Sequence, residues 1–358
     1  MLNSGITEIK LFNIRNFKQK NIFFSKNHSL FKGKNAVGKT NILEAISFLS
    51  PGNGFKKESL ANLINKFSIE DGASIVVNFI DNQIVQRLHI IFQIQESKWS
   101  KKYFLNDKKI TQQELMNIFQ LFWFTELDKV FFIKDKQYHR NYCNRIMCYY
   151  DPNLFKLLNN YLSLRKEKKN ILKTTIDLSW LQSIDQQLLE ITYSIITIKI
   201  NFIKEFKSFS LTYQNNFFQY QVNSHLEFMD TAEFIQNFKS ELLKENQSKG
   251  DYSLKSELDP SKIVFHLMHK GIKINQLSSA QSKMLILSFL LDIAFFLKAN
   301  KHKITIFLID EIFDNFDMIN LQKVIKYCAE NNFQSFFSST DNFTIKDEIK
   351  DLEIINIT

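Results

Sequence analysis

Eight residues near the N-terminus, from Gly33 to Thr40, have types and spacing suited to binding a phosphate group. They fit the phosphate-loop pattern G-x-x-x-x-G-K-[ST] completely. In this pattern the glycines let successive backbone N–H groups point at the phosphates, the lysine reaches the β- and γ-phosphate oxygens, and the threonine hydroxyl ligates Mg²⁺. The predicted nucleotide-binding residues are Gly33, Lys34, Asn35, Ala36, Val37, Gly38, Lys39 and Thr40, with Thr40 also a predicted metal ligand.

Two carboxylates, Asp310 and Glu311, directly follow an apolar run near the C-terminus. Residues 304–309 are consecutive strand formers, which predicts a strand buried on both faces of a sheet. Carboxylates at the C-terminal end of such a strand emerge where α/β proteins bind ligands. We therefore expect Asp310 to hold Mg²⁺, and Glu311 to orient or deprotonate the water that attacks the γ-phosphate.

The residues around the phosphate loop predict the elements that position it. Residues 29–32 can form a short strand before the loop, and residues 40–50 have apolar side chains at helical spacing. Most of the chain separates Thr40 from Asp310, whereas a compact phosphate-loop enzyme of one domain brings the two motifs much closer together. The sequence therefore predicts a large insert between them.

The insert contains two segments predicted to form a short antiparallel helical hairpin. Apolar residues recur at spacings of three and four from Leu181 to Phe202, the pattern of a helix that packs along one seam. The expected partner runs from Leu154 to Leu172, with Leu154, Leu158 and Tyr161 facing the seam. The same spacing also fits the core of a helical lobe.

Basic residues follow the strands predicted before the hairpin, at residues 73–80, 86–94 and 101–110, with Asn106 and Asp107 in a tight turn. They are Arg87, Lys98, Lys101, Lys102, Lys108 and Lys109, and a second basic set at the hairpin is Arg165, Lys166, Lys168 and Lys169. Such a sheet can present a basic face to a phosphate backbone. A lysine-rich antiparallel sheet is more often a solvated edge, so DNA contact is the less common alternative.

Composition sets limits on location and partners. The net charge of +9 and the isoelectric point near 9.1 favour a polyanionic partner, although AT-biased codon usage accounts for a Lys-, Asn-, Ile- and Phe-rich chain equally well. Three cysteines without a CxxC pair fit a reducing compartment. The N-terminus lacks a signal pattern, and the apolar run from Met284 to Leu297 is interrupted by Asp292 and short for a bilayer. We therefore expect a soluble cytoplasmic protein without membrane contact.

A serine-rich turn, Leu-Ser-Ser-Ala-Gln at residues 277–281, precedes the long apolar helix expected before the Asp310 strand. It fits an ordinary helix N-cap by Ser278 or Ser279. It also fits an anion-binding helix N-terminus. The turn alone does not decide between these alternatives.

The order of these motifs resembles that of the ABC-type ATPases, whose signature turn is Leu-Ser-Gly-Gly-Gln. This resemblance implies that two subunits sandwich ATP and that Ser278 of one subunit contacts the γ-phosphate held by the other. It also implies that Asp317 lies in the loop joining the two sites and that residues 336–341 form the switch segment. Ala280 replaces a signature glycine and Asp341 stands where histidine is usual, so slow hydrolysis is expected.

Residues 7–60 and 300–317 resemble the RecF family, the recombination-mediator ATPases of bacteria. The Leu-Ser-Pro-Gly-x-Gly element at residues 49–54 is characteristic of that family. The resemblance implies an α/β fold, an ABC-type P-loop ATPase lobe with an inserted helical lobe. It assigns residues 1–128 to the N-terminal part of the ATPase lobe, 129–260 to the helical lobe, and 261–358 to the C-terminal part with signature and switch.

Two functions from different classes follow from this resemblance. The first is an ATP-dependent homodimeric clamp on single-stranded or gapped DNA, a weak DNA-stimulated ATPase that helps to load RecA together with RecR and RecO. The second is a degenerate ATP-dependent protein scaffold with little hydrolysis or DNA binding. Ala280, Asp341 and the change of an Arg-Arg-x-Phe-Leu-Asp-like motif to the sequence at residues 139–144 support the second.

Overall fold

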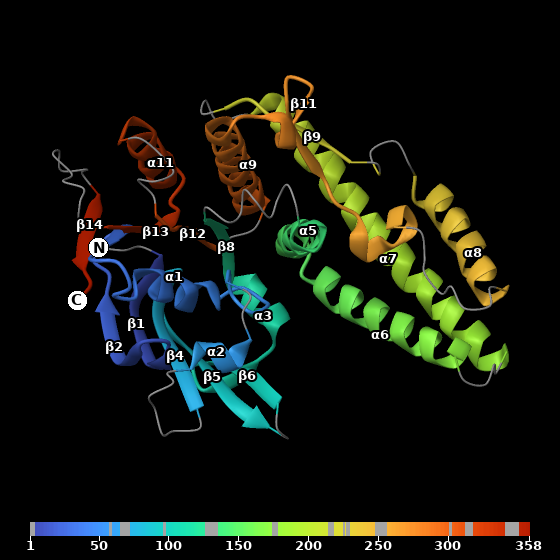
Figure 1. Cartoon of the computed structure of the whole chain (residues 1–358), viewed down its shortest axis with the longest axis horizontal. Coiled ribbons are helices and arrows are strands. Elements are labelled where there is room, and N and C mark those ends of the chain that lie inside the picture. Colours follow the sequence, from blue (N-terminus) through green and yellow to red (C-terminus); the bar gives the residue numbers. More distant parts are fainter. Residues whose placement is uncertain are drawn as a thin grey trace. The chain divides into compact units, whose positions relative to one another are not determined.

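The chain forms two compact units in a computed structural model, shown in Figure 1. The structure describes residues 4–56, 59–64, 72–95, 98–125, 135–173, 178–213, 218–224, 226, 230–247, 256–300, 303–311, 318–340 and 351–358. The first unit comprises Met1–Asp128 and Lys298–Thr358, and the second Lys129–Leu297. The second unit thus includes residues 261–297, which the family resemblance assigned to the C-terminal part of the ATPase lobe. The division of the chain into an ATPase lobe in two parts and an inserted helical lobe remains a prediction.

A five-stranded parallel sheet in the first unit carries both predicted nucleotide motifs. Its order is β14 (Leu352–Asn356), β3 (His28–Lys32), β13 (Gln334–Ser339), β12 (Ile304–Ile309) and β8 (Phe119–Phe124). Every residue of β8, β12 and β13 is buried, as expected for parallel strands covered on both faces. The predicted α/β class and the doubly buried strand before Asp310 are confirmed.

A six-stranded antiparallel sheet completes the β-structure of this unit. Its order is β2 (Phe17–Phe23), β1 (Gly5–Ile14), β4 (Gly72–Asp81), β5 (Ile84–Gln95), β6 (Lys98–Leu105) and β7 (Lys108–Ile110). Asn106 and Asp107 form the turn between β6 and β7 with φ of 47° and 67°, values that Asn and Asp adopt in tight hairpins. The predicted strands and turn are confirmed.

Helix α1 (Lys39–Ser47) joins the two sheets into one core. It contacts both β1 and β13, and its apolar residues belong to a single cluster that includes side chains from both sheets. The smaller helices of this unit are α2 (Leu60–Leu63), α3 (Gln112–Ile118) and α11 (Met318–Glu330). Because α1 begins at the phosphate loop, burial of its apolar side chains fixes the position of the loop.

The second unit is mainly helical (Figure 1). It contains α5 (Lys136–Tyr150), α6 (Asn153–Lys173), α7 (Leu178–Thr212), α8 (Thr231–Gln247) and all but the last three residues of α9 (Ser279–Asn300), with 3₁₀ turns at Ser256–Leu258, Pro260–Lys262 and Ile274–Gln276. A small antiparallel sheet has the order β11 (Ile272–Lys273), β10 (His266–His269) and β9 (Gln221–Asn223). Helices α6 and α7 pack together as the predicted hairpin, and α8, which the sequence did not predict, packs on α7.

Helix α9 is longer than its apolar run indicated. The window Ser279–Ala299 is long and apolar enough to cross a membrane, so the sequence-based judgement that this region is too short was wrong. However, 78% of that window is buried within the protein. Its apolar composition is therefore explained by packing in the core of the second unit.

We expect the first unit to lose stability in mild acid because of His28 on β3. The imidazole is 1% exposed, and burial lowers its pKa to about 4, although Asp351 acts in the opposite direction. Folding then favours the neutral form, so its contribution is complete above pH 6.5 and is lost as the pH falls toward 4. Between pH 7.5 and 5 the loss should be about 2 kcal/mol in the free energy of unfolding.

Urea denaturation at both pH values measures this loss, and a His28→Gln variant supplies the comparison. Its stability should change less with pH than that of the parent, because the contribution of the buried His28 is removed. A smaller pH dependence should remain from the half-buried His139, whose pKa burial lowers to about 4. Equal pH dependence in the two proteins would show that His28 is not the cause.

Candidate functional site

The phosphate loop connects β3 to α1 in a tightly curled conformation. Ala36 and Gly38 have positive φ values of 66° and 109°, and Gly38 is the N-cap of α1 without a side-chain hydrogen bond to the first turn. The middle residues Lys34, Asn35 and Ala36 are exposed, whereas Gly33 and Gly38 are buried. The loop thus presents an open surface at a helix N-terminus, the arrangement that binds anions in phosphate loops.

Both glycines of the pattern are required by close packing. A Cβ atom at Gly33 would lie 2.4 Å from the Ile357 carbonyl oxygen, next to the C-terminal strand. A Cβ atom at Gly38 would lie 2.5 Å from Phe17 Cζ and 2.7 Å from Asn16 Nδ2. A side chain therefore cannot be added at either position without moving these neighbours.

The side chain of Lys39 lies over the loop. Its Nζ donates hydrogen bonds of 2.7 Å to each of the carbonyl oxygens of Gly33 and Lys34, and the residue is 8% exposed. The ammonium group is therefore positioned within the loop by two backbone acceptors. A lysine held in this way can supply positive charge to phosphates bound by the loop amides.

The two motifs at opposite ends of the sequence meet at the C-terminal ends of the parallel strands. Thr40 Oγ1 donates a 3.1 Å hydrogen bond to Asp310 Oδ1. Asp310 follows β12, and its N–H donates to the Phe124 carbonyl oxygen at the end of β8. The structure thus brings together both predicted metal ligands at the edge where α/β sheets bind ligands.

Ser338, which sequence reasoning did not single out, completes this cluster. Its hydroxyl donates to Asp310 Oδ1 and accepts a 2.8 Å hydrogen bond from the Glu311 N–H. Ser338 is at the end of β13, between β3 and β12 in the sheet order. The sequence did contain one indication of this role, because Ser338 belongs to the predicted switch segment and lies near the C-terminal end of a strand.

Glu311 is exposed and has a left-handed backbone, with φ of 51°. This conformation is uncommon for a residue other than glycine, asparagine or aspartate, and it is often found at functional sites. The hydrogen bond from its N–H to Ser338 stabilises the turn. Its predicted role in activating water remains a prediction.

The turn between β1 and β2 supports the loop from the side. Asn16 Nδ2 donates to the Val37 carbonyl oxygen at 2.9 Å, and Asn16 Oδ1 accepts from Asn41 Nδ2 at 2.8 Å. Arg15 donates two hydrogen bonds, of 2.8 and 2.6 Å, to the buried carboxylate of Glu44 on α1. This turn therefore binds both the loop and the helix that follows it.

The residues present fit Mg²⁺ with a nucleotide. Mg²⁺ prefers oxygen ligands and is commonly held by one or two protein groups together with substrate phosphates and water. The Thr40 hydroxyl and the Asp310 carboxylate provide such a pair beside the phosphate loop. Among the described residues no group of three His, Cys, Asp or Glu side chains is suited to a metal.

The signature segment lies in the second unit. Ser278 Oγ accepts from the Gln281 N–H at 3.3 Å, and Gln281 Oε1 accepts from the Ser278 N–H at 3.1 Å. This reciprocal pair is a capping box at the start of α9. Ser278 therefore acts as an N-cap of α9, one of the two alternatives that the sequence left open. That Ser278 also contacts the γ-phosphate held by a partner subunit remains a prediction. Asp317 and Asp341 lie outside the described residues.

Three of the basic residues considered for DNA contact are engaged within the protein. Lys101 donates to the Gly52 carbonyl oxygen and lies over the Phe48 ring, and burial lowers its pKa to about 8. Arg165 pairs with Glu245 through two hydrogen bonds of 2.7 Å, and the fully buried Lys168 pairs with Asp185 at 2.6 Å. These three side chains support packing. Arg87, Lys108 and Lys109 are exposed.

Comparison with known proteins agrees with this geometry. The model of the RecF/RecN/SMC N terminal domain family matches residues 5–356. The chain is 24% identical to the DNA replication and repair protein RecF of Rickettsia peacockii, with 98% of this chain and 99% of the relative covered. It is 23% identical to the RecF protein of Rickettsia canadensis, with both chains fully covered.

Solved structures show the same fold. A structure of the recombination mediator protein RecF with ATP superposes with a TM-score of 0.79 at 20% identity, covering 99% of this chain and 97% of that one. A second RecF structure gives a TM-score of 0.78 at 19% identity, covering 99% and 96%. The RecF resemblance indicated by the motifs is confirmed, and the chain belongs to the RecF/RecN/SMC N terminal domain family.

Proposed function

We propose that this chain is an ATP-dependent DNA-binding protein of DNA replication and recombinational repair. ATP joins two copies, the dimer holds single-stranded or gapped DNA, and together with RecR and RecO it helps to load RecA. The observation that supports the proposal is the 3.1 Å hydrogen bond between Thr40 and Asp310, two residues that are far apart in sequence and that we assign to the nucleotide site. The DNA role is supported by the relatives, which include the DNA replication and repair protein RecF and a recombination mediator protein of the RecFOR pathway.

In this proposal each group acts on a defined part of the nucleotide. The loop amides and Lys39 bind the phosphates, while Thr40 and Asp310 hold Mg²⁺, which neutralises phosphate charge when bound. Glu311 orients the attacking water, and Ser278 of the second copy contacts the γ-phosphate. ATP favours the dimer because it is bound by both copies there and by one copy otherwise. We expect this chemistry to take place in the cytoplasm.

Steady-state ATP hydrolysis with and without gapped DNA tests the proposal. We expect slow turnover that gapped DNA increases several-fold, and a Lys39→Met variant should reduce it by about 100-fold or more because one charged donor to the phosphates is lost. Circular dichroism of the variant serves as the folding control. ATP binding without turnover under any DNA condition would contradict the proposed ATPase.

One specific observation favours the protein-scaffold alternative. Lys101, Arg165 and Lys168, which were considered for DNA contact, form hydrogen bonds or ion pairs within the protein instead. A salt titration of DNA binding separates the two functions. A clamp that contacts phosphates binds DNA in the presence of ATP, and its affinity falls steeply as salt rises. Little DNA binding, changed by neither ATP nor salt, would favour the scaffold.

A further inference from the structure

The outer face of the six-stranded antiparallel sheet carries both basic and aromatic side chains, whereas its other face is packed in the core of the first unit. Paired residues of neighbouring strands point to the same side of a sheet. The register from β1 to β7 therefore defines one row of Lys10, Val76, His89, Phe104 and Lys109. The row beside it consists of Phe12, Ser74, Ile91 and Lys102. With strands about 4.8 Å apart, the first row is about 19 Å long.

Three cations on this outer face are available to a ligand. Arg87 and Lys109 are exposed, and Lys102 is half-buried. Within the described part of the chain, no hydrogen bond or ion pair engages these three side chains. Lys10, in contrast, lies 3.3 Å from the carboxylate of Glu8. The three available cations can contact the phosphate groups of a nucleic acid.

Aromatic rings lie among these cations. Phe104 is half-buried, and its direct neighbour on β5 is His89, while Phe12 on β1 is 37% exposed. Burial lowers the pKa of His89, and Arg87 acts in the same direction while Asp107 opposes it, so the imidazole is uncharged near neutral pH. Accessible rings beside cations are the arrangement on which single-stranded nucleic acids stack their bases.

The composition of the outer face favours single-stranded DNA over a protein partner or a duplex. Lysine is depleted in the cores of protein–protein interfaces, whereas two of the three available cations here are lysines. The bases of a duplex are already stacked on one another and do not reach side-chain rings. An unpaired strand, in contrast, can place its phosphates against cations and its bases against rings at the same time.

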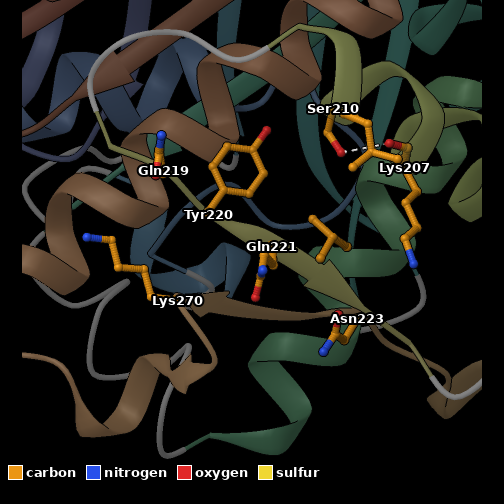
Figure 2. Close-up of a pocket in the computed structure, with 9 residues that line it drawn as sticks. Lys207, Ser210, Gln219, Tyr220, Gln221, Asn223 and Lys270 are labelled. Carbon is orange, nitrogen blue, oxygen red and sulfur yellow. Dashed lines mark hydrogen bonds between the residues drawn. The ribbon is translucent and has the colours of Figure 1, made fainter.

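A second basic surface, the pocket shown in Figure 2, lacks accessible rings. It lies between α7 and β9 in the second unit, and its lining includes Lys207 and Lys270. The aromatic residue in its described lining, Tyr220, is 3% exposed and donates a 2.9 Å hydrogen bond to Asp292. This pocket therefore offers no stacking platform to a base.

We propose that single-stranded DNA binds across the outer face of the six-stranded sheet. Its phosphates contact Arg87, Lys102 and Lys109, and two of its bases stack on Phe12 and Phe104. The inference rests on the proposed function, because it assigns a surface to the DNA that the proposed function requires. It also relates that surface to the nucleotide site, since the turn that follows β1 binds the phosphate loop.

Fluorescence anisotropy of a labelled oligothymidine of about 16 nucleotides tests the phosphate contacts on the full-length protein with ATP. The double variant Lys102→Gln/Lys109→Gln should weaken binding about tenfold at low salt. It should also reduce the slope of log affinity against log salt by about 1.4, because each phosphate contact on a single strand contributes about 0.7. The control Lys270→Gln/Lys273→Gln removes the same charge at exposed positions beside the pocket and should change affinity by less than about twofold.

An abasic oligonucleotide of the same length separates base stacking from phosphate contact, because it keeps the phosphates and lacks the bases. The double variant Phe12→Leu/Phe104→Leu removes both rings but keeps apolar side chains. It should weaken oligothymidine binding about tenfold and abasic binding by less than about twofold. The variant Lys102→Gln/Lys109→Gln should weaken both. Circular dichroism and urea denaturation serve as folding controls for each variant.

The possible outcomes separate this inference from the proposed function. Parental affinity in both variants of the outer face would overturn the inference and leave the proposed DNA binding in place. A loss confined to Lys270→Gln/Lys273→Gln would overturn it too and assign the DNA to the pocket. If the parent protein bound no oligothymidine at any salt concentration, with or without ATP, the proposed function itself would fail.

Discussion

An Asp310→Asn substitution should reduce Mg²⁺-dependent ATP turnover by about 100-fold or more while leaving the fold intact. The asparagine amide oxygen can still accept from the Thr40 and Ser338 hydroxyls that contact Asp310 Oδ1. The substitution removes the negative charge that attracts the metal. Turnover as a function of Mg²⁺ concentration measures this effect, together with nucleotide affinity in the presence and absence of Mg²⁺.

A Ser338→Ala variant is the matched control for the hydrogen bonds of this cluster. It removes one donor to Asp310 and the acceptor of the Glu311 N–H but leaves the carboxylate in place. We expect turnover to fall only about threefold to tenfold, with unchanged Mg²⁺ dependence. If the asparagine variant kept parental turnover and Mg²⁺ dependence, Asp310 would not be the metal ligand.

A Gly38→Ala substitution should destabilise the first unit by about 3 kcal/mol and abolish nucleotide binding. Its φ of 109° is unfavourable for alanine, and the new Cβ would meet Phe17 Cζ at 2.5 Å. Phe17 is itself 7% exposed, so the ring cannot move aside without disturbing the core. Urea denaturation and equilibrium binding of a fluorescent ATP analogue measure the two effects.

Gly52 provides the comparison that separates backbone strain from steric overlap. Its φ of 98° is similar, but no atom lies within 4 Å of a Cβ built at this position. A Gly52→Ala variant should therefore lose only about 1 kcal/mol and retain nucleotide binding. Equal losses in the two variants would show that the overlap at Gly38 relaxes without penalty.

The local motifs of the site were predictable because their physical requirements are local. The phosphate loop needs glycines at fixed positions before a helix, and the strand before Asp310 is a continuous apolar run. Both patterns are readable over a few residues, and the structure contains β3, α1 and β12 where the sequence placed them. The hairpin seam from Leu181 to Phe202 was predictable for the same reason.

The roles of several polar residues depend on partners that are distant in sequence. Lys168 belongs to a run of charged residues that would be expected to face solvent. It is nevertheless fully buried, and its ammonium group forms ion pairs with Asp185 and Glu245. Ser338 reaches Asp310 only because β13 is inserted between β3 and β12 in the sheet. Helix periodicity and motif spacing do not contain this information, since it arises when separate elements pack together.

The strand order of the five-stranded sheet has a consequence for synthesis of the protein. Both neighbours of β3, namely β13 and β14, are formed by residues 334–356, about 300 residues later in the sequence. At about 5–20 residues per second, the ribosome releases them on the order of tens of seconds after β3. During this interval the nascent first unit cannot complete its sheet, whereas Lys129–Leu297 is contiguous and can fold as it emerges. We therefore expect chaperones to engage the N-terminal segment, and ATP binding to begin only after β13 and β14 have emerged from the ribosome.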